Sequence, residues 1–110
     1  MPIPVLLADI EMQVVPDESP DTSYLEQEGF EERLAAYRNG DFGFIGVRAS
    51  VEIRVPHGRS SIMQRIVSPG LWGIEDDSGT DYLESVFQEE VGILKSMLEE
   101  LNCRVDNVED

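Results

Sequence analysis

The chain has 110 residues, a formal net charge of −15 and a 41% share of hydrophobic residues, which together indicate one domain with a modest core. A negative field of this size repels nucleic acid and anionic membranes, so we expect neither as a ligand and instead expect a protein partner with a basic surface. Cys103 is the single cysteine, which excludes an internal disulfide, and no apolar run reaches the roughly 18 residues of a membrane span, so we expect a cytoplasmic protein.

The charges are sorted along the chain. Residues 1–41 carry ten acidic residues and two arginines, and residues 75–110 carry twelve acidic residues and two basic ones. Residues 42–74 carry four arginines and one glutamate, a net charge of +3. Two acidic segments therefore flank a mildly basic centre, and these two segments supply most of the negative field.

Residues 5–15 alternate between apolar and polar side chains, which is typical of a half-buried strand. The side of this strand that is expected to be buried consists of Ala8, Ile10, Met12 and Val14. Two prolines, Pro16 and Pro20, then mark a connecting loop.

A helix is predicted over residues 23–38, with Ser23 and Glu26 as a capping box and an Asn-Gly pair directly after it as a stop signal. Its apolar stripe consists of Phe30, Leu34 and Tyr37. Gly29 interrupts the pattern, because glycine is unfavourable in the interior of a helix. The first turn is therefore expected to be separate or irregular.

The basic centre predicts a β-hairpin over residues 44–67. Apolar residues alternate strictly with other types from Ile45 to Val55, a Pro-His-Gly-Arg-Ser segment supplies the turn, and a second strand follows. Residues 71–74 (Leu-Trp-Gly-Ile) are either a continuation of that strand past a bulge or a packed loop.

A long apolar stripe predicts a helix over residues 80–101, and the tail over residues 102–110 is either a short edge strand or a frayed end.

From these elements we expect a single α+β domain over residues 1–110. Its predicted architecture has two layers, with an antiparallel sheet of three or four strands and both helices packed on one face. Asp9 and Glu11 would then share the solvent face of the sheet with Arg48 and Arg54, and they would pair with these arginines if the strands are neighbours.

The acidic segment over residues 75–81 is a candidate metal site, because it offers several hard oxygen ligands around a glycine. The candidate ligands are Asp76, Asp77 and Asp81, which would serve a metal-dependent hydrolase. The segment does not fit the calcium-binding loop pattern, because its first ligand position would be an isoleucine. We favour a helix start capped by Ser78 or Thr80, with no metal or cofactor.

Three single residues are candidates for function, each with a structural alternative. His57 is expected to be an exposed turn residue rather than a catalytic base, since no nucleophile is predicted to be held against it. Cys103 is expected to be a buried structural thiol. Trp72, which stands close to two glycines, is either an interface anchor or a plug packed on the C-terminal helix.

Four segments carry a resemblance: Asp-Thr-Ser-Tyr-Leu-Glu-Gln at residues 21–27, Arg-Leu-Ala-Ala-Tyr at 33–37, Phe-Ile-Gly-Val-Arg-Ala at 44–49 and Ser-Pro-Gly-Leu-Trp-Gly-Ile-Glu at 68–75. Through them, residues 21–101 resemble a group of small uncharacterised acidic proteins of bacteriophages, prophages and some bacterial genomes. The resemblance implies a mobile-element setting and assigns no activity to any residue.

Two non-enzymatic functions are open beside the hydrolase. The first is a small interaction module, for example a homodimer through a sheet edge or through Trp72, whose acidic residues serve solubility. The alternative is a nucleic-acid mimic that inhibits a host DNA- or RNA-binding protein by occupying its basic groove, with Glu84, Glu89 and Glu90 as contact residues. A continuous acidic stripe would favour the mimic, and an even scatter of charge would favour the module.

Overall fold

The alternating centre of the chain forms a long β-hairpin in the computed structural model, which describes residues 2–106. Its strands are β3 (Phe44–His57) and β4 (Ser60–Val67), which pair in antiparallel orientation. Gly58 and Arg59 form the turn, and Gly58 has a φ of 61° because a two-residue hairpin loop needs a positive φ at its first residue. The predicted hairpin is therefore present, with strands that reach further into the expected turn.

The two alternatives for residues 71–74 are resolved in favour of a strand that follows an interruption. β5 (Leu71–Glu75) pairs antiparallel with the beginning of β3. It lies along the same edge of β3 as β4, which pairs with the second half of β3. A Ser-Pro-Gly segment separates β4 from β5, and the pairing of β5 shifts register between Ile45 and Val47. β3 is thus the central strand of a four-stranded sheet, and β2 (Glu11–Pro16) forms its other edge.

The single strand predicted over residues 5–15 is two strands. One turn of 3₁₀ helix, η1 (Leu7–Asp9), separates β1 (Ile3–Leu6) from β2. β1 leaves the sheet and pairs in parallel with β6 (Cys103–Asp106). The prediction is wrong because the alternation of residue types is similar on both sides of the turn and does not reveal it. The predicted tail is a strand in its first part, and residues 107–110 lie outside the described residues.

β2 exposes side chains that its alternation assigns to the core. Met12 and Val14 are exposed, whereas Ile10, which directly precedes β2, is buried. The alternation identifies which residues share a face, but only the packing of the helices decides whether that face is covered.

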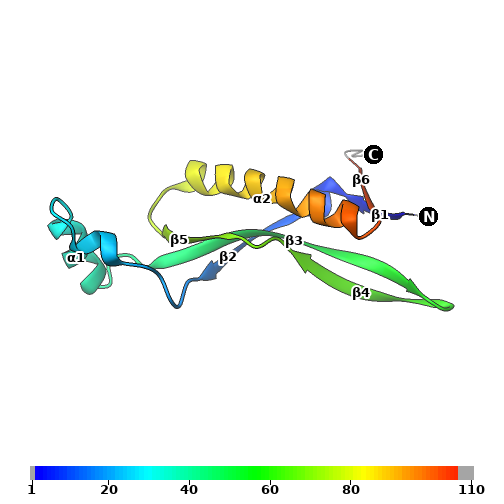
Figure 1. Ribbon diagram of the computed structural model, residues 1–110, viewed down its shortest axis with the longest axis horizontal. Coiled ribbons are helices and arrows are strands. Elements are labelled where there is room, and N and C mark those ends of the chain that lie inside the picture. Colours follow the sequence, from blue (N-terminus) through cyan, green and yellow to red (C-terminus); the bar gives the residue numbers. More distant parts are fainter. Residues whose placement is uncertain (1, 107–110) are drawn as a thin grey trace.

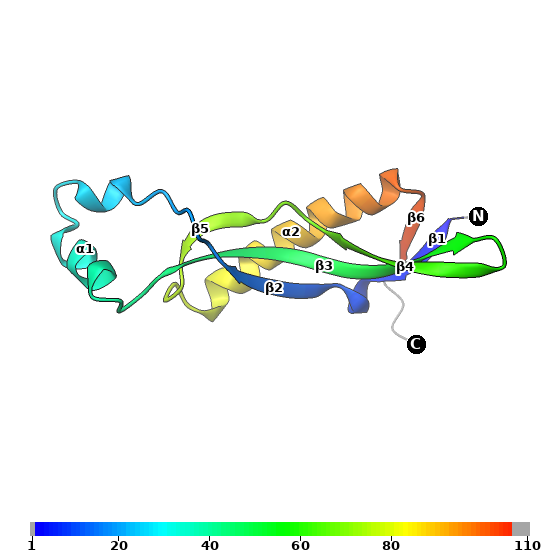
Figure 2. The same cartoon turned by 90° about the horizontal axis from the view of Figure 1, so that it is seen from below.

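The helix predicted over residues 80–101 forms α2 (Thr80–Glu100), which crosses one face of the sheet diagonally (Figure 1 and Figure 2). The core between them and the β1–β6 pair consists of Val5, Ile10, Ala49, Val51, Ile53, Val91, Leu94, Leu98 and Cys103. Leu94 and Leu98 are fully buried, and each contributes roughly 1.5–3 kcal/mol of transfer free energy. Within residues 2–106, no helix is both long enough and apolar enough to cross a membrane.

The start of α2 differs from the expected one. Gly79, with a φ of 94°, occupies the N-cap position, and no side chain caps the helix. Ser78 instead donates its hydroxyl to the carbonyl oxygen of Glu75 (2.6 Å), and Thr80 is the first helical residue. Because the loop requires a positive φ at this point, glycine takes the position that serine or threonine would otherwise fill.

The helix predicted after the proline-rich loop is interrupted. It consists of a 3₁₀ turn, η2 (Ser23–Glu26), and of α1 (Glu31–Arg38), and Gly29 between them has a φ of 96°, which no α-helix contains. The expected separate first turn is confirmed. The expected capping box is absent, because the N–H and the hydroxyl of Ser23 both donate to the carboxylate of Asp21 (3.0 and 2.7 Å).

α1 lies beyond the end of the sheet rather than on its face (Figure 1). Its apolar side chains join a cluster that consists of Tyr24, Leu25, Phe30, Leu34, Ala36, Tyr37, Phe42 and Phe44. Edge-on ring pairs such as Tyr37–Phe44, with centroids 5.2 Å apart, contribute about 0.5–1.5 kcal/mol each. The α+β class and the antiparallel four-stranded sheet are confirmed. Only α2 covers a sheet face, however, because the phenylalanines at the start of β3 provide α1 with a core of its own.

Candidate functional site

Glu90, which the sequence places among the interaction residues, is buried. It is 5% exposed, and its Oε1 atom accepts hydrogen bonds from Oγ of Ser68 and from the N–H of Gly70, both at 2.7 Å. Oγ of Ser68 in turn accepts the N–H of Ala49 (2.9 Å). Glu90 therefore ties α2 to the loop between β4 and β5. Its assignment as an interaction residue is wrong, because a buried carboxylate whose Oε1 atom is bonded within the protein is not presented to a partner.

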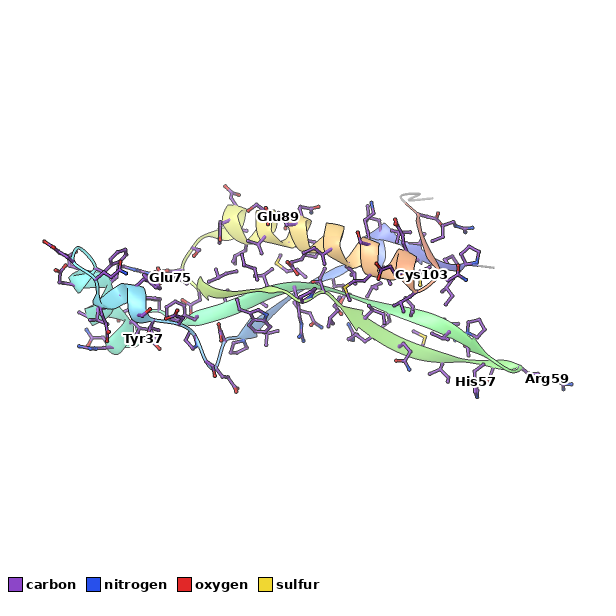
Figure 3. All side chains as sticks on the ribbon, viewed as in Figure 1. Tyr37, His57, Arg59, Glu75, Glu89 and Cys103 are labelled. Carbon is purple, nitrogen blue, oxygen red and sulfur yellow. The ribbon has the colours of Figure 1, made fainter. Side chains whose placement is uncertain are left out.

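The exposed acidic residues of α2 lie in its first half and at its C-terminal end, with none between. They are Asp81, Glu84, Glu89, Glu99 and Glu100. Glu84 accepts a hydrogen bond from Gln88 (3.0 Å), and Glu89 lies on the side of the helix away from the sheet (Figure 3). At 1.5 Å per residue, about 15 Å of helix without an exposed acid separates Glu89 from Glu99. α2 does not carry a continuous acidic stripe.

The three candidate metal ligands do not converge. The carboxylate of Asp77 is paired with Arg33 (Nη1–Oδ2, 3.0 Å), which lowers the pKa of Asp77 below its ordinary value. Asp76 and Asp81 are exposed. Among residues 2–106, no group of three or more histidine, cysteine, aspartate or glutamate side chains is arranged to hold a metal ion.

Arg33 links the aromatic end of the molecule to the loop between β5 and α2. Its guanidinium donates to Glu75 and to both carboxylate oxygens of Asp77 (3.0 and 3.1 Å), and its Cζ atom lies 3.8 Å from the ring centroid of Phe42. Salt bridges and stacking together fix this side chain. No local pattern in the sequence reveals this contact, because Arg33 and Glu75 lie 42 residues apart in the chain.

Tyr24 completes this group by donating its hydroxyl to the second carboxylate oxygen of Glu75. Burial, and then the hydrogen bond to Glu75, raise the pKa of Tyr24 to about 12. The hydroxyl therefore stays protonated at neutral pH and remains a donor. We call Tyr24, Arg33, Glu75 and Asp77 the clamp, because they hold the α1 end of the molecule against the sheet end.

An open groove of about 570 Å³ lies beside the clamp, and it is lined by Tyr24, Leu71, Trp72, Gly73, Ile74, Glu75, Ser78 and Tyr82. Trp72 is 43% exposed and Tyr82 is 46% exposed. The indole ring of Trp72 rests on β3, where a Cβ added to Gly46 would lie 2.3 Å from the ring, and its Nε1 donates to the carbonyl oxygen of Pro69 (2.9 Å). The ring is thus held in place while almost half of the residue faces solvent.

At the other end of the molecule, the hairpin projects as a two-stranded ribbon, which we call the arm (residues 54–63) (Figure 1). Figure 3 shows His57 and Arg59 at its tip, far from Glu75. His57 is exposed, as expected. Ile62 and Met63 are exposed apolar residues on β4, and the outer edge of β4 has no partner strand within the described part of the chain.

The arginines of β3 do not pair with the acidic residues expected opposite them. Arg48 donates from Nε to Oε1 of Gln13 (2.7 Å), and Arg54 donates from Nη1 to Oγ of Ser61 (2.9 Å). Asp9 lies in η1, outside the strand, which removes it from that face of the sheet. The hairpin therefore keeps much of the positive charge that the expected pairs would have neutralised.

Cys103 is buried in the core, as expected, and burial raises the pKa of its thiol.

Comparison of the chain with protein-family models, with curated proteins and with solved structures gives no match.

Proposed function

We propose that the protein is a non-enzymatic assembly module that binds another protein chain through its arm. The observation that carries the proposal is the open edge of β4 on a projecting ribbon, with Ile62 and Met63 exposed beside it. A strand edge without a partner is a template for pairing with another chain. Proteins that avoid such pairing place proline or lysine in their edge strands, and β4 (Ser60–Val67) contains neither.

The elongated shape supports the same function. A compact chain of this length has a radius of gyration of about 13 Å. The value here is 18.0 Å, and the principal dimensions are 59 × 26 × 20 Å. A two-stranded ribbon on its own is marginally stable in water, so we expect the arm to be covered by a partner when the protein acts.

The turn of the hairpin determines which backbone groups of β4 are available. Residues that flank a two-residue loop form a hydrogen-bonded pair, which here is His57 with Ser60. Hydrogen bonding alternates along an antiparallel pair, so Ser61, Met63 and Arg65 direct their N–H and C=O groups outward. Pro56 lies opposite Ser61 and agrees with this assignment, because its missing N–H would not have bonded β4. A partner strand can add to these outward groups by β-augmentation.

The two alternatives have less support. A nucleic-acid mimic based on α2 would need a run of exposed acids, but Glu90 is buried and no exposed acid lies between Glu89 and Glu99. A hydrolase would need Asp77 as a free ligand, and Arg33 occupies it. The mobile-element setting and the cytoplasmic location remain expectations from the sequence, as does a basic partner surface for the acidic remainder of the molecule.

The test compares capture of partners from a lysate of the source cells by the wild type, Met63→Pro and Met63→Ala. Proline removes an outward N–H of β4 and leaves the bonds to β3 in place, whereas alanine keeps the N–H and removes only the side chain. We expect a partner that the wild type and Met63→Ala capture and that Met63→Pro binds about tenfold or more weakly. Equal capture by Met63→Pro would contradict pairing through the arm.

Folding of these variants is checked by thermal unfolding. Met63→Pro should unfold within a few degrees of the wild type. Gln64→Pro is the matched comparison, because it removes an N–H that bonds β3, and it should unfold at a clearly lower temperature. If the two proline variants were equally destabilised, the assignment of inward and outward groups on β4 would be wrong.

A further inference from the structure

The two ends of the molecule carry opposite charge. The arm contains Arg54 and Arg59 and no acidic residue. At the opposite end, the groove and the loop that follows it carry Glu75, Asp76, Asp77 and Asp81, which together with Arg33 give a formal net charge of −3. Glu75 lies far from Arg59 along the long axis of the molecule, which extends 59 Å in all, so the two regions cannot meet within one chain (Figure 3).

The groove also has the chemistry of an arginine site. Trp72 and Tyr82 expose their rings in it, and a guanidinium binds favourably over the face of either ring type. The molecule already contains one such contact, because Arg33 lies 3.8 Å over the ring of Phe42. The volume of about 570 Å³ is in the range of sites that hold a small ligand, and it can therefore admit the narrow tip of a two-residue turn.

The tip of the arm matches this site. Arg59 is the second residue of the turn, it is exposed, and Gly58 before it has no side chain that would obstruct entry. The net charge of −15 opposes contact between copies, but the Debye length is about 8 Å at 0.15 M ionic strength. The charge of the rest of the molecule is thus screened, and the charges within a few ångströms of the contact decide its sign.

From these observations we propose that the tip of the arm of one copy, led by Arg59, docks in the groove at Trp72 and Tyr82 of a second copy. This inference rests on the proposed function, since it makes a second copy of the chain one of the partners of the arm. The contact is head to tail, because the two surfaces are different and lie at opposite ends. Repetition of such a contact gives a ring when the rotation closes and a filament when it does not.

The test is sedimentation velocity of the purified chain at about 0.15 M salt over a wide range of protein concentration. The wild type should associate as concentration rises and dissociate at about 1 M salt. Arg59→Glu and the double variant Asp76→Lys/Asp81→Lys should each weaken association about tenfold or more. An equimolar mixture of these two variants should associate again, because each then meets a partner of opposite charge.

The aromatic part of the site has its own matched pair of variants. Tyr82→Ala removes a ring of the groove, and Ile93→Ala removes a comparably exposed apolar side chain of α2 outside it. Association should weaken about threefold or more in Tyr82→Ala and stay unchanged in Ile93→Ala.

Three results would overturn the inference. The first is a wild type that stays monomeric at every concentration, and the second is a mixture of charge variants that does not recover. The third is association that Met63→Pro abolishes and Arg59→Glu leaves intact, which would mean that copies pair along β4. None of these results contradicts the proposed function, which fails only if Met63→Pro captures its cellular partner as well as the wild type does.

Discussion

At position 90, a glutamate stands where the spacing of α2 places a core residue, four residues after Val86 and four before Leu94. This spacing was the available signal that Glu90 faces inward, although its neighbours Glu89 and Gln88 are exposed. The acid is tolerated because Ser68 and Gly70 satisfy it with two hydrogen bonds.

Replacing this glutamate tests the role of its hydrogen bonds. Glu90→Ala should lower the free energy of unfolding by about 2–4 kcal/mol, because it leaves the buried hydroxyl of Ser68 and the partly buried N–H of Gly70 without an acceptor. Glu89→Ala, the adjacent exposed position, should change it by less than about 0.5 kcal/mol. Urea unfolding measures both values, and similar values for the two variants would refute the structural role of Glu90.

The contact between the indole ring of Trp72 and Gly46 of β3 can be tested in the same way. In Gly46→Ala the new Cβ would lie 2.3 Å from the indole ring, so the ring must move, and we expect a loss of about 1–3 kcal/mol. The emission of the single tryptophan should shift as its surroundings change. Gly92→Ala is the control, since nothing lies within 4 Å of its added Cβ and alanine is favoured in a helix by about 1 kcal/mol. Unchanged emission in Gly46→Ala would show that the ring does not rest on β3.

At the scale of elements, α1 depends on contacts that are separate from those of α2. Its aromatic cluster shares no residue with the core under α2. The clamp joins the two parts, because Arg33 and Tyr24 from the α1 end both bond Glu75 at the end of β5. We therefore expect α1 and η2 to loosen before the sheet does when the clamp is broken.

Alkaline pH removes the contribution of Tyr24 to the clamp. The pKa of Tyr24 is raised from 10.0 to about 12, so the neutral hydroxyl stabilises the folded state. This contribution is complete below pH 10, where tyrosine is neutral in both the folded and the unfolded chain. It is lost as the pH rises from 10 to about 12.

The wild type should accordingly lose stability between these two pH values, and Tyr24→Phe should lose less over the same interval. Chemical unfolding at a series of pH values measures the difference between the two proteins. The two proteins differ only in the hydroxyl of Tyr24, so the difference reports this group alone. Parallel stability profiles for the two proteins would contradict the role of the hydroxyl in the clamp.

At the scale of the whole molecule, shape and charge act together. A net charge of −15 on a sphere would give a uniformly repulsive surface, but the long axis separates the basic arm from the acidic groove end by much more than a Debye length. Arg59 stands at the tip of the arm, far from Glu75 of the groove, because the hairpin extends outward instead of folding back on the groove end (Figure 3).

Local signals in the sequence determined the hairpin, the position of α2 and the break at Gly29, because each depends on spacing or on backbone freedom within a few residues. The tertiary structure alone decided where α1 lies, since its apolar stripe fits a sheet face and an aromatic cluster equally well. It also decided the pairing of β1 with β6, the clamp of Arg33 and the groove at Trp72. These features join residues distant in the sequence, and such contacts depend on the geometry of the folded chain.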